Sequence, residues 1–177
     1  MKQASSLRQW IGFGVATLLG TILHFLYDWS GSMIAAPFSG VNESVWEHMK
    51  LLFRPLFLFA LVQRLFFRAQ KNYWCVKLWS ILLGLFLIPV LYYTYNGAFG
   101  KSPDWLNIAI FYICAGAVFL LERWGFQHLQ ASCRFVFAAI CLVGLLFVVF
   151  TFAPPKLPLF LDPATGSYGV PHKNAAG

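Results

Sequence analysis

Residues 134–153 read RFVFAAICLVGLLFVVFTFA and carry no charge after Arg134. A helix rises 1.5 Å per residue, so a run of this length can cross the roughly 30 Å hydrocarbon core of a bilayer. The run lacks the period-2 alternation of a barrel strand, and we therefore predict a membrane-spanning helix. Four further runs of the same character lie near 10–29, 45–67, 76–95 and 105–122.

The composition of the whole chain excludes the soluble protein classes. Of its 177 residues, 59% are hydrophobic and only 11% are charged. So few charged side chains cannot cover a water-facing surface. We therefore predict an all-α, polytopic membrane helix bundle of about five helices over residues 1–153, followed by an extracytoplasmic tail over residues 154–177.

Lys and Arg set the expected orientation, because cytoplasmic loops hold the excess of these residues. Eight of the 13 lie in segments that would share a side with the amino terminus, and three lie on the opposite side. We predict an amino terminus inside and a carboxyl terminus outside, in a bacterial cytoplasmic membrane. Basic residues divided among short loops argue against a nucleic-acid partner. The expected partners are membrane lipids, and a homo-oligomer is left open.

The four cysteines, Cys75, Cys114, Cys133 and Cys141, lack the paired spacing of a zinc site. Thiols within apolar segments act as small hydrophobic groups. We therefore expect four free thiols, with palmitoylation of Cys75 or Cys133 near the inner interface as the alternative.

Acidic residues and histidines gather toward the predicted outer end of the bundle. Five of the six acidic residues and three of the four histidines map there. Ionisable groups at membrane depth cost roughly a few kcal/mol each, so such a cluster is a functional hypothesis. His24 and Asp28 are four residues apart at the end of the first run, which places both on one helical face.

The segment VNESVWEHMK, residues 41–50, enters the second run. Ser44 and Glu47 have the spacing of a capping box, which favours a helix start. Glu47 also begins a stripe that continues through Lys50 and Arg54 at three- and four-residue steps. His48 points about 100° away from Glu47 on a helix, and the sequence leaves open which of the two faces the bundle interior.

These side chains suggest a metal site with an adjacent anion site. The candidate metal ligands, for Zn²⁺ or another divalent ion, are His24, Asp28 and His48. The candidate catalytic carboxylates are Glu47, Glu43 and Asp28. The candidate anion-binding residues are Lys50 and Arg54.

Two resemblances arise at this segment. The string Asn42–Lys50, together with a tail containing Phe160-x-Asp162-Pro163-x-Thr165-Gly166, looks like an uncharacterised bacterial integral-membrane family of unknown function. A more local similarity, at Ser44, Trp46 and His48, is to the progestin and adiponectin receptors and alkaline ceramidases, which are membrane hydrolases. The first resemblance implies a fold and no activity, whereas the second implies hydrolysis.

Two classes of function follow from the sequence. The first is a metal-dependent hydrolase or transferase that acts on a lipid or lipid-linked substrate at an outward-facing polar site. The alternative is a non-catalytic membrane protein, either a module that binds an anionic ligand or a partner, or a small transporter subunit. The sequence alone leaves the question of enzymatic activity undecided.

Overall fold

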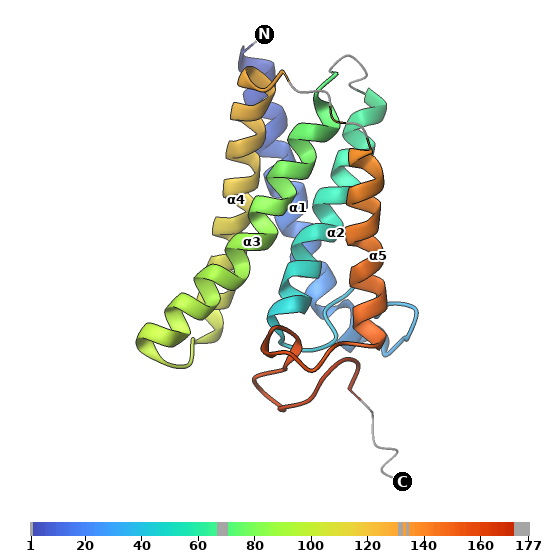
Figure 1. Ribbon diagram of the computed structural model, residues 1–177, viewed down its shortest axis with the longest axis vertical. Helices are drawn as coiled ribbons and strands as arrows, with labels where there is room; N and C mark the ends of the chain where they lie inside the picture. Colours follow the sequence, from blue (N-terminus) through green and yellow to red (C-terminus); the bar gives the residue numbers. More distant parts are fainter. Residues whose placement is uncertain (1, 67–70, 131–132, 134, 172–177) are drawn as a thin grey trace.

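Five α-helices hold most of the chain in the computed structural model, which describes residues 2–66, 71–130, 133 and 135–171 (Figure 1). Their bounds are α1 (Lys2–Ser30), α2 (Val45–Phe66), α3 (Tyr73–Phe99), α4 (Asp104–His128) and α5 (Val136–Phe152). A single 3-10 turn, η1 (Pro158–Phe160), follows. The predicted all-α bundle is therefore confirmed.

Three of the helices are long and apolar enough to cross a membrane. These segments are Leu7–Ser30, Tyr73–Phe99 and Trp105–His128, and Val136–Phe152 is a shorter apolar helix. α2 is of sufficient length but carries Glu47, Lys50 and Arg54 in its first half. The chain thus has the apolar helices of a membrane protein, with the charged helix packed among them.

The amino terminus lies at one end of the bundle and the carboxyl-terminal segment at the other (Figure 1). We call these the amino end and the tail end. α3 and α4 run side by side and lean away from the other helices toward the tail end (Figure 1). Their interface includes Gly84, where an added Cβ would lie 2.5 Å from the Val118 side chain. Small residues permit such close helix approach inside membranes.

The connection between α1 and α2, residues 31–44, is partly buried in the bundle. Ala36 and Ser39 are fully buried. The Ser39 hydroxyl donates a 2.5 Å hydrogen bond to the Leu23 carbonyl and accepts one of 2.8 Å from the Tyr27 backbone N–H. Buried loop backbone needs such partners, because no water is available to it. This loop is therefore a structural part of the tail end.

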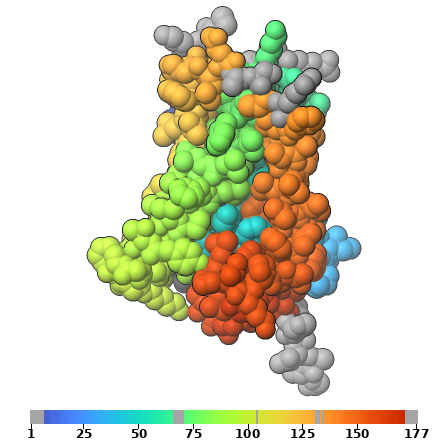
Figure 2. Space-filling view, in the orientation of Figure 1, coloured from blue at the N-terminus to red at the C-terminus, as the bar shows by residue number. Residues whose placement is uncertain are grey.

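Residues 154–171 form a folded cap at the tail end, next to α5 (Figure 2). The Phe160 ring packs on Trp46 at the start of α2, with ring centroids 4.7 Å apart. Asp162 is buried, and its carboxylate accepts hydrogen bonds from the Ala164 N–H and the Thr165 hydroxyl, at 2.9 and 2.7 Å. The predicted tail is thus folded over residues 154–171, whereas 172–177 lie outside the described residues, and its extracytoplasmic location stays a prediction.

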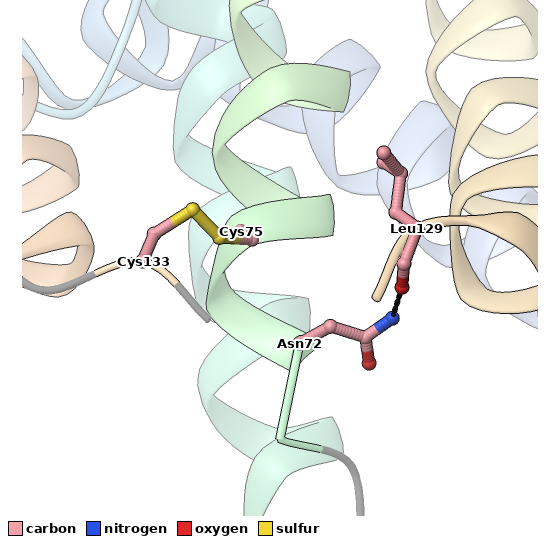
Figure 3. Close-up of a disulfide and its surroundings, with 4 residues drawn as sticks. All are labelled: Asn72, Cys75, Leu129 and Cys133. Carbon is pink, nitrogen blue, oxygen red and sulfur yellow. Dashed lines mark hydrogen bonds between the residues drawn. A yellow bond between two sulfur atoms is a disulfide. The ribbon is translucent and has the colours of Figure 1, made fainter. Parts of the chain in front are cut away.

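At the amino end, a disulfide joins Cys75 of α3 to Cys133, which precedes α5 (Figure 3). Their Cα atoms are 5.6 Å apart although 58 residues separate them in sequence. Beside them, the Asn72 side-chain amide donates to the Leu129 carbonyl (Figure 3). Cys75 and Cys133 are bonded in this structure, so the expectation of four free thiols, or of an acylated Cys75 or Cys133, is wrong for the oxidised protein. Local spacing carries no information on two segments that meet only after the helices pack.

Candidate functional site

The first turn of α2 presents side chains to two different parts of the molecule. The Ser44 hydroxyl accepts the Glu47 backbone N–H at 3.4 Å, which confirms Ser44 as the helix cap. The Glu47 carboxylate does not return to Ser44, as a capping box requires, but accepts the Val41 N–H at 3.0 Å. Glu47 therefore faces the buried loop, whereas His48 faces α1 and α4.

Glu47 belongs to a closed network with Lys50. The Lys50 ammonium lies 2.6 Å from Oε2 of Glu47, and donates to the Ala36 carbonyl at 2.8 Å and to the Thr151 hydroxyl at 2.9 Å. Both side chains are buried, with 0% and 3% exposed. An ammonium has three N–H donors, and all three are used here.

Arg54 lies one turn farther along the same stripe. Its guanidinium donates to the Pro37 carbonyl at 2.8 Å and lies over the Phe38 ring at 5.2 Å from the centroid. A longer contact of 3.5 Å reaches the Gly144 carbonyl, and the Nε atom is buried without a partner. Lys50 and Arg54 thus hold the α1–α2 loop, and their predicted anion-binding role stays a prediction.

His24, Glu43 and His48 form a second cluster on the other side of α2. Nε2 of His24 lies 3.6 Å from Oε1 of Glu43, and Nε2 of His48 lies 3.6 Å from Oε2 of the same carboxylate. The two imidazole centroids are 5.9 Å apart. These separations exceed ordinary hydrogen-bond lengths, so the three groups face one another without direct bonds.

The tautomer of His48 follows from the contact that its Nδ1 atom makes. Nδ1 of His48 lies 2.9 Å from the Ser44 carbonyl oxygen. A carbonyl only accepts hydrogen bonds, so Nδ1 must carry the proton. In the neutral ring, the lone pair of Nε2 is therefore directed toward Glu43.

This cluster lines a partly open cavity of about 530 Å³ between α1, α2 and α4. The volume lies within the range of ligand pockets, roughly 300–1,000 Å³. The lining residues are Gly20, Thr21, His24, Phe25, Glu43, His48, Leu51, Asn107, Ile108, Phe111, Tyr112 and Ala164. One wall is therefore polar and the rest is mainly apolar, and the tail contributes Ala164 to the rim.

The predicted site residues are only partly brought together. His24 and His48 meet at Glu43, whereas Asp28 is exposed and does not line the cavity. Glu47 is directed away into the Lys50 network. In the part of the chain that the structure describes, no three His, Cys, Asp or Glu side chains are grouped so that they could hold a metal ion.

Several participants escaped the sequence reasoning. Thr151 of α5 accepts from Lys50, and the Asn42 side chain donates to the Gly169 carbonyl of the tail at 2.9 Å. Asn107 lines the cavity from α4. The polar character of Thr151 within an otherwise apolar run was the available signal for the first, and the sequence has no comparable signal for the other two.

The model of a family of unknown function, DUF6512, matches residues 1–170. The chain belongs to this family. The match covers the helices together with the folded tail, in line with the resemblance to an uncharacterised membrane family. No curated protein and no solved structure matches the chain. The local similarity to progestin and adiponectin receptors and alkaline ceramidases stays a prediction.

Proposed function

We propose that this DUF6512 protein binds an amphiphilic molecule within the membrane, in the cavity between α1, α2 and α4. The observation that carries the proposal is the composition of the cavity wall. His24, Glu43 and His48 supply one polar corner, whereas Phe25 and Ile108 supply apolar surface.

The position of the apolar wall supports this proposal. Phe25, Ile108 and Tyr112 line the cavity, yet 43%, 59% and 40% of their surfaces are exposed. On an apolar bundle, exposed aromatic and aliphatic groups face lipid. A hydrocarbon chain could then enter sideways from the bilayer while its polar end reaches the corner that contains Glu43.

Blocking the cavity tests the proposal. Thr21 lines the cavity, so Thr21→Trp should fill it. Native mass spectrometry of the full chain, released from lipid nanodiscs, should show a retained amphiphile on the wild type and none on Thr21→Trp. Leu18→Trp is the matched control, because Leu18 lies on the same helix, is 62% exposed and is not a lining residue. Equal retention by wild type and Thr21→Trp would contradict the proposal.

A metal-dependent hydrolase or transferase acting on the same class of molecule is the second candidate. The observation in its favour is the Nδ1–H of His48 directed at the Ser44 carbonyl, since metal-binding histidines commonly donate their second nitrogen in this way. Calorimetric titration with Zn²⁺ tests this candidate. Stoichiometric binding that His48→Gln abolishes would support it, and the absence of binding to the wild type would contradict it.

A further inference from the structure

We infer that the polar end of the bound molecule is a primary ammonium group, held by His24, Glu43 and His48. This inference rests on the proposed amphiphile-binding function. It specifies the chemistry of the ligand, which the shape of the cavity alone does not.

The polar corner of the cavity offers hydrogen-bond acceptors. Glu43 presents a carboxylate whose side chain is 50% exposed. Neutral His48 presents the Nε2 lone pair, because its Nδ1 proton is committed to the Ser44 carbonyl. Acceptors that face one another at 3.6 Å are not bonded to each other, so a donor placed among them would satisfy both.

The charge of the corner disfavours an anion. No Lys or Arg is among the described residues that line the cavity. Lys50 follows His48 by two residues in the sequence, but its side chain is fully buried. Its three N–H donors are directed to Glu47, Ala36 and Thr151. A phosphate or carboxylate would therefore meet the Glu43 carboxylate without a compensating cation.

A primary ammonium has as many N–H donors as the corner has candidate acceptors. It has three N–H donors, and the corner offers Nε2 of His48, the Glu43 carboxylate and, in the tautomer of His24 that is protonated at Nδ1, Nε2 of His24. The Lys50 ammonium, elsewhere in the same molecule, already occupies a site built on one carboxylate and two further acceptors.

An ammonium and a metal ion need different arrangements of the surrounding side chains. Hydrogen bonds to nitrogen are about 2.8–3.0 Å long, whereas bonds from zinc to nitrogen or oxygen are about 2.0–2.2 Å. Within the described residues, no group of His, Cys, Asp and Glu side chains is arranged so that it could hold a metal ion, which favours the ammonium.

Amphiphiles of one chain length separate the contributions of charge and of N–H donors. The probes are dodecylamine, dodecyltrimethylammonium, dodecanol and dodecanoate, titrated at pH 8 into the full chain in non-ionic detergent. At this pH imidazoles are mainly neutral and alkylamines are protonated. We expect dodecylamine to bind at least tenfold more tightly than each of the other three, measured by native mass spectrometry.

Three variants assign that preference to the corner and to the cavity separately. Glu43→Gln should weaken dodecylamine binding about tenfold, the equivalent of roughly 1.4 kcal/mol, and leave dodecanol binding unchanged. Glu43→Asp, which keeps the charge, should retain part of the preference. Thr21→Trp should abolish binding of all four probes.

The outcomes distinguish the two proposals. Equal binding of the trimethylammonium probe or of dodecanoate to the wild type would overturn the ammonium inference while leaving the amphiphile site intact. Probe binding that is as tight in Thr21→Trp as in the wild type would overturn the proposed function itself. Zn²⁺ binding that displaces dodecylamine and requires both histidines would assign the corner to a metal instead.

A chainless probe, ethylamine, distinguishes a lipid ligand from a free amine. We expect ethylamine to bind at least tenfold more weakly than dodecylamine.

Discussion

Glu47 and Lys50 illustrate how a buried ion pair is tolerated in an apolar bundle. Removing two charges from water costs several kcal/mol per ion, and the attraction repays this only when the remaining donors and acceptors are satisfied. Here Val41 supplies a donor to the carboxylate, and Ala36 and Thr151 supply acceptors to the ammonium. The pair consequently ties the α1–α2 loop and α5 to the first turns of α2.

Removal of only one charge of this pair should be strongly destabilising. In Lys50→Met, the Glu47 carboxylate stays buried with the Val41 N–H as its remaining donor. We expect a loss of about 3–5 kcal/mol, as for other broken buried pairs. The apparent melting temperature of the purified protein in detergent measures it.

Two companion variants make this prediction specific to the pair. Glu47→Gln/Lys50→Met removes both charges and should recover part of the loss, because no unpaired charge is left. Lys101→Met, at an exposed position, should melt like the wild type. A Lys50→Met protein as stable as Lys101→Met would show that the network does not hold the loop.

The candidate site was only partly predictable at this scale. The spacing of Glu47, Lys50 and Arg54 predicted their common stripe, because helix periodicity is local. The sequence could not decide whether Glu47 or His48 faces the interior, because the two side chains pack against different parts of the molecule. Asp28 shares a helical face with His24, yet the loop that follows α1 brings Glu43 to His24 instead.

At the scale of whole helices, close packing depends on a few small residues. α3 packs tightly against α4 at Gly84, where an added Cβ would meet Val118 at 2.5 Å and Leu52 of α2 at 3.1 Å. Inside a membrane, apolar side chains gain little by leaving lipid, so helix association relies on such fitted contacts.

Gly84→Ala should therefore weaken the packing of α3 against α4. The added methyl must displace Val118 or the helix axis, and overpacking of this kind costs about 1–3 kcal/mol. Gly97→Ala is the matched control in the same helix, because no atom lies within 4 Å of the Cβ position there. Thermal melting in detergent should separate the two variants, and equal melting temperatures would contradict the packing argument.

The helices themselves were predictable because each needs only a local apolar run. Their ends were less so: α3 spans 73–99 against the expected 76–95, and α4 spans 104–128 against 105–122. Polar and aromatic residues at both ends extend these helices beyond the hydrocarbon length. The partial burial of residues 31–44 could not be predicted, because it depends on Lys50 and Arg54 binding loop carbonyls.

The whole molecule has two chemically different ends. The tail end holds the cavity, the Glu47–Lys50 network and the folded cap. The amino end holds the Cys75–Cys133 disulfide and a second buried pair, Lys77 and Glu122, at 2.7 Å. The excess of Lys and Arg in the segments of the amino end predicts that this end is cytoplasmic.

The disulfide allows that orientation to be tested, because disulfides are rare in a reducing cytosol. If the amino end is cytoplasmic, Cys75 and Cys133 should be thiols in growing cells and should pair only when the isolated protein is oxidised.

The assay uses a Cys114→Ala/Cys141→Ala chain, so that both remaining cysteine sulfurs belong to this pair. A membrane-impermeant maleimide should label it only after the cells are permeabilised, since Cys133 is exposed at that end. Ser167→Cys, in an otherwise cysteine-free chain, provides the opposite control, because Ser167 is exposed in the tail and should be labelled in intact cells. Labelling of Cys133 from outside, or a disulfide already present in cells quenched with a permeant alkylating agent, would place the amino end on the extracytoplasmic side and reverse the predicted topology.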